Sequence, residues 1–445
     1  MNDPLSIRAA AQDAGERTAL RVDGRGYSFV ELAARVAPCI DALPSGRDPV
    51  PVTGVNMLEV LLTLYALLEA RRPALLLHPR HTPAEQAEEI ESTRGAAAGL
   101  PQDAAAILYT SGTTGRARGA VLTRRALVAS ARASAANLGW HDDDCWLLAL
   151  PLARVGGLSI VTRCLIARRA VVLMPAFDAA ALPRWIDEHR VTLLSLVPTM
   201  LAQLLDRNPN WRPPPRLRAV LLGGASASPK LLARATDRGI PLVITYGCTE
   251  TCSQVVATPY AQRFDPAPAG AGRPLAGAEV RAHGERIVVR GAMCMSGYLG
   301  QTPLAPDDWF DTGDLGEFDS AGCLHLHARR TDLIVSGGEN VYPAEVERML
   351  EDCPCIEAAA VFGVPDEAWG QIVAAVLVAS APYEHALDAE RENQLLQFLA
   401  GRLAVYKRPR RVVWARALPL APTGKLDRAM LETLGPALRP LRHRI

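Results

Sequence analysis

The chain has 445 residues, of which 49% are hydrophobic, so it can bury more than one core and we expect two domains. Its 48 basic and 47 acidic residues give a formal net charge of +1, which excludes a general basic field for nucleic acid or a membrane surface. An anionic ligand must therefore be held locally. The nine cysteines show no regular spacing, which indicates free thiols in a reducing compartment.

The N-terminal segment carries an early acid and no apolar core stretch, which argues against a secretory signal. The most apolar stretch, Leu58 to Leu77, is interrupted by Glu69, Arg71 and Arg72 before it reaches the ~20 residues that a bilayer requires. We therefore expect a cytoplasmic protein with no membrane span and no nucleic-acid partner. The sequence leaves open a possible homo-oligomer.

Short runs rich in Val, Ile and Leu alternate with amphipathic stretches along the first part of the chain. Buried strands that alternate with helices are typical of a layered α/β domain with parallel strands. The expected strands are Ala105–Tyr109, Cys145–Leu150, Ala170–Met174, Leu193–Val197, Ala219–Leu222 and Leu242–Thr245. The expected helices are Leu127–Leu138, Leu182–His189, Met200–Asp206 and Lys230–Arg238.

The pattern changes beyond Gly270 to short strands separated by Gly and Asp turns, which predicts a small β element. After Asp332 the sequence predicts, in order, a strand, a Gly-Gly turn, a helix that begins at Pro343, two strands and a further helix. We therefore expect an α/β fold class with a large N-terminal domain and a small, mobile α+β C-terminal domain. The expected boundaries are 1–328 for the large domain, 329–332 for a hinge and 333–445 for the small domain.

The segment Ile107 to Gly119 runs from a buried strand into a loop of hydroxyls, glycines and a cation. Glycines let the backbone approach a polyphosphate, hydroxyls and amides donate to its oxygens, and a basic side chain balances its charge. The absence of GxxxxGK[ST] disfavours a P-loop NTPase. A plain Ser/Thr/Gly turn is the alternative explanation, but it gives no reason for four consecutive small donors after a buried strand.

Thr110-Ser-Gly-Thr-Thr-Gly115 resembles the phosphate loop of the adenylate-forming superfamily, which includes acyl-CoA synthetases, luciferases and peptide-synthetase adenylation domains. Other segments resemble further motifs of that superfamily in the same order along the chain. They are Gly223-Gly-Ala225 (adenine site), Tyr246-Gly-Cys-Thr-Glu250 (YGxTE), Thr312-Gly-Asp314 (TGD), Ala328-Arg-Arg-Thr-Asp332 (hinge), Ser336 to Val346 (C-terminal domain) and Pro422-Thr-Gly-Lys425 (terminal lysine loop).

The resemblance implies a ligase that uses ATP, Mg²⁺ and coenzyme A. A carboxylate would form an acyl-adenylate and then pass its acyl group to the thiol of coenzyme A. The implied catalytic residues are Thr249, Glu250 and Lys425, with Glu250 also a magnesium ligand. Lys425 would offset the repulsion between two anions in the transition state. The implied ATP-binding residues are Thr110, Ser111, Gly112, Thr113, Thr114, Gly115, Arg118, Gly223, Gly224, Ala225, Tyr246, Gly247, Asp314 and Arg329.

Each of these residues has an ordinary structural explanation when it is taken alone. Glu250 then fits a solvated surface residue, Tyr246 a core tyrosine and the Thr-Gly-Asp segment a β-turn. A Gly-Lys near a C-terminus is usually only a turn charge. By resemblance, Thr331 would lie in the hinge. Gly337 and Gly338 would let the backbone approach the pantetheine of coenzyme A, with a structural turn as their alternative.

The closest likeness within the superfamily is to the o-succinylbenzoate-CoA ligases of menaquinone synthesis, because the segments ending at Leu201, Gln254 and Asn340 look much like theirs. That substrate has two carboxylates, so its site needs a cation besides the catalytic one. Arg163 is the candidate, with a solvated helix arginine as the alternative. Val197, Thr199, Gly247, Cys248 and Ser253 would line the acyl pocket.

The chain departs from the family pattern at three places. Arg116-Ala-Arg118 stands where x-Pro-Lys is usual, which keeps the charge but changes its geometry. Pro151-Leu-Ala-Arg154 lacks the usual histidine near the acyl pocket, which puts the acid in doubt. Thr331 stands where Asp or Lys is common, although a flexible hinge does not require charge.

Two groups of residues outside these motifs are expected to be surface features. The basic clusters Lys407–Arg411 and Arg439–Arg444 could contact the 3′-phosphate of coenzyme A, but solvated faces fit them better. His325 and His327 share a strand face, and no carboxylate partner for them is evident in the sequence.

Other functions remain as alternatives to an o-succinylbenzoate ligase. The nearest is a ligase for another aryl or fatty acid, or an adenylation enzyme that loads a carrier protein. A non-catalytic nucleotide-binding protein is disfavoured because Glu250, Asp314, Arg329 and Lys425 are all retained. A serine hydrolase is disfavoured because no G-x-S-x-G elbow is present.

Overall fold

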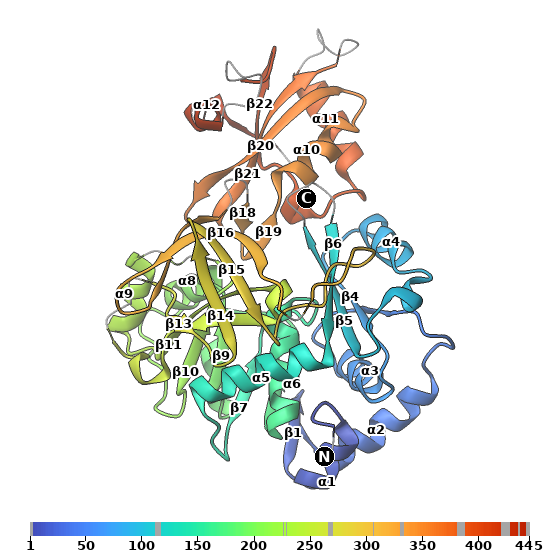
Figure 1. Cartoon of the computed structure of the whole chain (residues 1–445). Helices are drawn as coiled ribbons and strands as arrows, with labels where there is room; N and C mark the ends of the chain where they lie inside the picture. Colours follow the sequence, from blue (N-terminus) through green and yellow to red (C-terminus); the bar gives the residue numbers. More distant parts are fainter. Residues whose placement is uncertain are drawn as a thin grey trace. The chain divides into compact units, whose positions relative to one another are not determined.

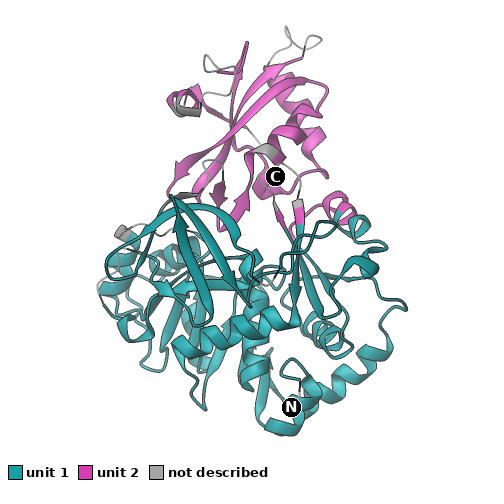
Figure 2. Cartoon of the chain, viewed as in Figure 1, with its two compact units in different colours: residues 1–79, 89–109, 119–329 teal, residues 80–88, 110–118, 330–445 magenta. Residues whose placement is uncertain are grey.

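The computed structural model describes residues 3–111, 117–225, 227, 229–265, 270–305, 307–329, 333–380, 388–419, 428–434 and 437–441. The chain divides into two compact units, which Figure 2 shows in different colours. Unit 1 holds residues 1–79, 89–109 and 119–329, and unit 2 holds residues 80–88, 110–118 and 330–445. The domain and hinge boundaries expected from the sequence stay a prediction.

A nine-stranded sheet is the largest element of unit 1. Its inner strands are parallel and almost wholly buried, as expected for crossover connections, while both edges are antiparallel. Across the sheet the strands are β13 (Arg273–Pro274), β12 (Ser253–Ala257), β11 (Leu242–Cys248), β10 (Ala219–Leu222), β9 (Leu193–Leu196), β7 (Cys145–Leu148), β8 (Ala170–Leu173), β1 (Thr18–Val22) and β2 (Arg25–Ser28).

A four-stranded sheet consists of β3 (Val50–Thr53), β4 (Ala74–Leu77), β5 (Ala104–Ser111) and β6 (Ala117–Thr123), and all of it except the end of β5 and the start of β6 belongs to unit 1. The helices α5 (Arg124–Leu138) and α6 (Val155–Ala167) run between the strands of the two sheets (Figure 1). The side chain of Thr123 caps the start of α5 by accepting a hydrogen bond from the backbone N–H of Ala126 at 3.1 Å. The buried face of α6 carries Arg163 into the core of unit 1.

The remaining helices of unit 1 and the helix shared between the two units cover these sheets. The α-helices are α1 (Ile7–Ala14), α2 (Phe29–Asp41), α3 (Leu58–Glu69), α4 (Pro83–Ser92), α7 (Leu182–Glu188), α8 (Pro198–Arg207) and α9 (Pro229–Asp237), and the 3-10 helices are η1 (Ala96–Gly99), η2 (Thr249–Thr251) and η3 (Tyr260–Gln262). Among the described residues, no helix is both long and apolar enough to cross a membrane.

An antiparallel four-stranded sheet follows in the chain and confirms the predicted small β element. Its order is β14 (Ala278–His283), β15 (Arg286–Gly291), β16 (Phe310–Phe318) and β17 (Leu324–Arg329). Strand β16 carries Asp314, which pairs in register with Arg329 of β17. The hairpin thus brings these two candidate residues onto neighbouring strands.

Unit 2 is an α+β unit whose central sheet is covered on both faces. The sheet runs β19 (Glu339–Val341), β18 (Ile334–Ser336), β21 (Gly370–Ala379), β22 (Arg411–Ala415) and β23 (Arg439–Pro440), with β20 (Ile356–Asp366) also paired to β21. Val361 of β20 packs with α10 (Pro343–Glu351) and α11 (Asp388–Leu399), while Phe362 packs with Leu431 of α12 (Arg428–Thr433). The 3-10 helix η5 (Val405–Lys407) completes the unit.

The α/β class and the two-unit architecture expected from the sequence are confirmed. Helix α10 begins at Pro343 as predicted, and the proline occupies the first turn, where its missing N–H costs nothing. All nine cysteines are free thiols, also as expected.

Candidate active site

Two glycines shape the backbone where strands β10 and β11 end. A Cβ on Gly247 would lie 1.9 Å from the backbone oxygen of Ser253, and a Cβ on Gly223 would lie 2.3 Å from Oγ1 of Thr245. Such distances leave no room for any side chain. Gly224 has a φ of +82°, a conformation that glycine adopts without strain. Ala225, the last residue of the candidate adenine-site segment, follows Gly224. The candidate adenine-site and YGxTE segments therefore need glycine for a physical reason.

Tyr246 and Asp314 are joined directly. The hydroxyl of Tyr246 donates to Oδ2 of Asp314 at 2.8 Å and lies 3.0 Å from Oγ1 of Thr312. Tyr246 and Asp314 are each 6% exposed. Burial, with the neighbouring Asp314 carboxylate, raises the pKa of Tyr246 far above its usual range, so its hydroxyl stays a donor. The structure thus brings together two motifs that are distant in the sequence.

The turn from Cys248 to Ser253 is tightly held and strained. Oγ1 of Thr251 donates to the backbone oxygen of Ser253 at 2.8 Å and lies 3.1 Å from that of Cys248. Cys252 and Ser253 have φ values of 51° and 95°, which are costly for residues with a Cβ. Ser130 donates to the backbone oxygen of Cys252 at 2.7 Å and secures this conformation. Strain of this kind concentrates at functional sites.

Glu250 lies in this turn, in η2, next to Thr249, and both residues are half-buried. The hydroxyl of Tyr298 donates to Oε1 of Glu250 at 2.8 Å, and the backbone N–H of Met295 donates to the main-chain oxygen of Glu250 at 2.7 Å. The carboxylate therefore has a fixed orientation. An oriented carboxylate oxygen suits the Mg²⁺ that accompanies ATP. Tyr298 was not predicted from the sequence, because a tyrosine outside a motif gives no signal of its partner.

Arg163 is buried in α6, not solvated, so the alternative explanation for it is wrong. Its side chain is 3% exposed, and its Nε and Nη2 atoms have no hydrogen-bond partner in the structure. The guanidinium stacks 5.6 Å from the ring centre of Trp146, whose Nε1 donates to Ser195 at 3.1 Å. Burial lowers the pKa of Arg163 to about 10, which leaves it cationic at neutral pH.

A buried cation with unused donors is costly unless an acceptor binds to it. The geometry around Arg163 therefore suits an anionic or carbonyl group of a ligand. Trp146 contacts Arg163, and Ser195 holds the indole of Trp146 by a hydrogen bond. Sequence reasoning missed both residues, because these contacts join side chains of α6, β7 and β9. Gln254 is also buried, and its side-chain amide nitrogen, Nε2, has no hydrogen-bond partner in the structure.

The other residues expected to line the acyl pocket lie at element ends in unit 1. Val197 precedes α8, and its Cγ1 lies 3.3 Å from where a Cβ of Gly224 would be. Thr199 is in the first turn of α8. Cys248 is half-buried, and burial raises the pKa of its thiol well above the usual value, which favours the protonated thiol. These positions remain candidates.

The candidate phosphate loop connects β5 and β6. Thr110 is described, and its hydroxyl donates to the backbone oxygen of Arg118 at 3.4 Å. The residues Gly112, Thr113, Thr114 and Gly115 lie outside the described residues, as does the side chain of Ser111.

The remaining candidates belong to β17 or to unit 2. Gly337 and Gly338 form the turn between β18 and β19, with φ values of +59° and +81°. A Cβ on Gly337 would lie 2.5 Å from the ring of Trp369, so this turn requires glycine. Arg329 is described in its backbone and not in its side chain, and Thr331 and Lys425 lie outside the described residues.

Lys407 corrects one sequence expectation. The sequence predicts a solvated basic cluster at this position, but Lys407 is 4% exposed and donates to Glu345 at 2.7 Å and to Glu85 at 2.9 Å within unit 2. Although its own burial opposes the charge, the two carboxylates raise the pKa of Lys407 above its usual range. It is an internal ion-pair partner and not a contact for a solvent-exposed phosphate.

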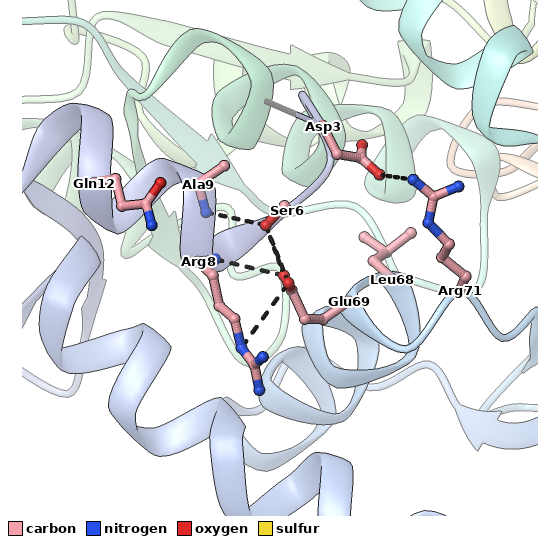
Figure 3. A pocket seen from close by; sticks show the side chains of 8 residues that line it. All are labelled: Asp3, Ser6, Arg8, Ala9, Gln12, Leu68, Glu69 and Arg71. Atoms are coloured by element: carbon pink, nitrogen blue, oxygen red, sulfur yellow. Dashed lines mark hydrogen bonds and ion pairs between the residues drawn. The ribbon is translucent and has the colours of Figure 1, made fainter. Parts of the chain in front are cut away.

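A small hollow of about 260 Å³ lies elsewhere in unit 1 (Figure 3). It is lined by Ser6, Arg8, Glu69 and neighbours of α1 and α3. Glu69 accepts from the hydroxyl of Ser6 at 2.9 Å and from the backbone N–H of Ile7 at 3.0 Å, so it caps the start of α1. The polar groups of this hollow serve the fold, and none of the predicted site residues lines it.

Comparisons with known proteins address the chain as a whole. The family described as AMP-binding enzyme matches residues 84–299, and the AMP-binding enzyme C-terminal domain matches residues 345–425. A 2-succinylbenzoate–CoA ligase of Bacillus cereus is 33% identical over 470 aligned positions, covering 94% of this chain and 96% of that protein. Similarity therefore extends through both units.

Solved structures are likewise similar to this chain over nearly its whole length. An o-succinylbenzoate CoA synthetase of Bacillus subtilis, a double mutant bound with a product analogue, is 31% identical with a TM-score of 0.86 and covers 96% of this chain and 97% of its own. That synthetase has also been solved with an acyl-adenylate intermediate and with ATP and magnesium. An amide bond synthetase of Marinactinospora thermotolerans is 27% identical with a TM-score of 0.83, covering 96% of this chain and 99% of its own.

Proposed function

The chain belongs to the AMP-binding enzyme family, and from this premise we propose that it is an ATP-dependent o-succinylbenzoate-CoA ligase. In the first half-reaction a carboxylate oxygen of the acid bonds to the α-phosphorus of ATP, and the bond to pyrophosphate breaks. In the second, the thiolate of coenzyme A bonds to the acyl carbon, and AMP leaves. The proposed product belongs to menaquinone synthesis, in the cytoplasm.

The nucleotide side of the proposal rests on the hydrogen bond between Tyr246 and Asp314. Asp314 keeps one carboxylate oxygen on Tyr246, and a carboxylate at this position suits the two ribose hydroxyls of ATP. The ring of Tyr246 is fixed by the same bond, so it can lie against an adenine without losing further freedom. Glu250, oriented by Tyr298, would bind the Mg²⁺ that enters with ATP as part of the substrate.

The observation that carries the choice of acid is the buried guanidinium of Arg163. Its partnerless Nε and Nη2 atoms favour a substrate with a second anionic group, and o-succinylbenzoate has both an aromatic and a succinyl carboxylate. A monocarboxylic fatty acid would leave this cation buried and unsatisfied. The names of the Bacillus relatives agree with a dicarboxylate.

Lys425 supplies the catalytic cation in this proposal. When the carboxylate approaches the α-phosphate, negative charge accumulates on the phosphoryl oxygens, and a positioned ammonium stabilises that state more than the ground state. The family resemblance supports the assignment. We further propose that the small domain turns about a hinge at residues 329–332, so that Lys425 gives way to coenzyme A at Gly337 and Gly338.

A panel of acids tests the proposed function. Pyrophosphate release with ATP and Mg²⁺ should be fastest with o-succinylbenzoate, slower with benzoate and slowest with medium-chain fatty acids. The thioester should form only when coenzyme A is added. Adenylate formation with a fatty acid but not with o-succinylbenzoate would reject the proposed acid.

The acceptor is tested in the same assay. The amide bond synthetase of Marinactinospora thermotolerans shares this architecture, so an amine is a competing acceptor. Adenylate that is consumed by an amine or by a carrier protein, and not by coenzyme A, would reject the ligase assignment. A wild-type chain that makes no adenylate from any acid in the panel would favour a non-catalytic nucleotide-binding protein.

A further inference from the structure

The tip of the β16–β17 hairpin in unit 1 brings together three different metal-binding side chains. Asp319 follows β16, Cys323 immediately precedes β17, and His325 is the second residue of β17. A carboxylate oxygen, the thiol sulfur and an imidazole nitrogen all lie within 4.8 Å of one another. The expectation that His325 has no nearby carboxylate partner is wrong, because Asp319 lies 2.9 Å from its imidazole.

The turn that carries these side chains is fixed by Asp319 itself. Its Oδ1 atom accepts the backbone N–H groups of Ala321 and Cys323 at 2.9 and 2.8 Å. Its Oδ2 atom lies 2.9 Å from Nε2 of His325. One oxygen therefore holds the turn while the other faces the imidazole. Ligands held in this way lose little conformational freedom when an ion binds.

The neighbouring segment at Gly270 leaves room for the thiol and clamps the strand. A Cβ on Gly270 would lie 2.7 Å from Sγ of Cys323, so a larger residue would displace the sulfur. The backbone of Leu324 donates to Gly272 at 2.8 Å and accepts from Ala271 at 2.7 Å. Asp319 and His325 are 40% and 27% exposed in their side chains, so an ion can enter from solvent and keep a bound water.

We propose that Asp319, Cys323 and His325 bind a divalent transition metal ion, with Zn²⁺ the best match and water as the fourth ligand. Sulfur, nitrogen and oxygen donors together suit a borderline-soft tetrahedral ion, whereas a thiol disfavours Mg²⁺ and Ca²⁺. Metal–ligand bonds of about 2.0–2.3 Å place the ligand atoms of a tetrahedral site roughly 3.3–3.8 Å apart. The three ligand atoms already lie within 4.8 Å of one another, which is close to this spacing.

Binding of the metal ion releases one proton from the protein. Cys323 loses its thiol proton to solvent and binds as the thiolate, and His325 binds through a neutral nitrogen. The contact between His325 and Oδ2 of Asp319 is replaced by two bonds to the ion. No redox step is involved. The site is separate from the residues of the proposed ligase reaction and does not depend on that function.

Co²⁺ is a suitable probe, because its tetrahedral thiolate complexes have visible and near-ultraviolet absorption bands. Zn²⁺ has no such visible bands. The full chain, freed of metal with a chelator, should bind about one equivalent of Co²⁺ with a thiolate charge-transfer band, and added Zn²⁺ should remove that band. Cys323→Ser should abolish the band, and His325→Gln should weaken Co²⁺ binding by about 10- to 100-fold. Asp319→Asn keeps the oxygen that holds the turn and removes the carboxylate, so it should also weaken binding.

Two control variants separate this site from other thiols. Cys294→Ser removes another half-buried thiol of unit 1, and Cys353→Ser removes one of two buried thiols of unit 2 whose sulfurs lie 3.2 Å apart. Both should retain the cobalt band. A wild-type chain without the band, a band that persists in Cys323→Ser, or a band that disappears in Cys353→Ser would each overturn the proposal. Circular dichroism of every variant verifies folding, and His325→Gln provides the test if Cys323→Ser does not fold.

Discussion

The hydroxyl of Tyr246 donates to Oδ2 of Asp314 at 2.8 Å, across 68 residues of sequence. Both side chains are buried, so the bond is shielded from competing water. It couples the position of a candidate adenine-stacking ring to the position of a candidate ribose acceptor. A change to either residue should therefore weaken the binding of the whole nucleotide, and not only of its adenine or its ribose.

Tyr246→Phe should weaken ATP binding. The substitution leaves the ring but deprives a buried carboxylate of a donor, which costs about 1–3 kcal/mol. We expect the KM for ATP to rise about 5- to 100-fold, with a smaller change in the KM for the acid. Steady-state kinetics of pyrophosphate release measure both. Tyr65→Phe removes a hydroxyl from a core tyrosine and is the matched control; an equal effect in that variant would mean that the bond has no special role.

Gly247→Ala should disrupt the turn after β11. The added methyl group would meet the backbone oxygen of Ser253 at 1.9 Å, and backbone cannot move aside as a side chain can. We expect adenylate formation to fall at least about 100-fold, because Thr249 and Glu250 follow directly. Gly99→Ala is the control, since a Cβ there meets nothing within 4 Å. Activity retained in Gly247→Ala would show that this turn does not position the chemistry.

Arg163→Met should change the choice of acid rather than the use of ATP. Met fills the buried space without a charge, so a dicarboxylate loses its partner while a monocarboxylate does not. The kcat/KM for o-succinylbenzoate should fall by about 30-fold or more, which is roughly 2 kcal/mol or greater, and the KM for ATP should stay within about twofold. Equal losses for o-succinylbenzoate and benzoate would remove Arg163 from substrate recognition.

Lys425→Ala should separate nucleotide binding from chemistry. Loss of the cation should lower adenylate formation by about 100- to 1,000-fold while ATP affinity changes little. Single-turnover formation of the adenylate and equilibrium binding of ATP measure the two effects. Thioester formation from supplied acyl-adenylate and coenzyme A should be largely retained, because that step does not join two anions. Normal adenylate formation in the variant would disprove the role.

The buried pair of Asp144 and Arg218 should make the stability of unit 1 sensitive to acid. Nε of Arg218 donates to Oδ1 of Asp144 at 2.7 Å. Burial alone would raise the pKa of Asp144, but the Arg218 guanidinium and the backbone N–H of His141 outweigh it and hold the pKa below its usual value. The stabilisation is therefore present above the unfolded-state pKa of about 3.9 and is lost as the pH falls through the lower folded-state value.

Denaturant unfolding tests this pair. Asp144→Ala leaves the Arg218 charge buried without its partner and should cost about 3–5 kcal/mol at neutral pH. Asp142→Ala breaks an ion pair with Arg169 in which Asp142 is 91% exposed, so it should cost about 1 kcal/mol or less. The difference between Asp144→Ala and wild type should shrink toward pH 3. A difference that grows on acidification would contradict the assignment.

The sequence by itself determined the fold class and the order of the motifs. Alternation of apolar runs with helical patterns specifies parallel strands with crossover helices, and Pro343 marks the start of α10 because proline is favoured in the first turn of a helix. Gly223 and Gly247 were identified by their place in motifs, and the structure supplies the reason, since a Cβ at either position would collide with its neighbours.

Only the tertiary structure decided how side chains from distant segments pair. The sequence did not predict the hydrogen bonds of Tyr246 with Asp314, Glu250 with Tyr298 or His325 with Asp319, because each contact depends on the register of neighbouring strands and turns. The tertiary structure also decided which charged side chains are buried. Lys407 and Arg163 are both basic residues in mixed surroundings, yet one is neutralised by two carboxylates and the other lies under Trp146 without a hydrogen bond from Nε or Nη2. Residue type sets which chemistry is available, and packing decides which groups meet and how much water they keep.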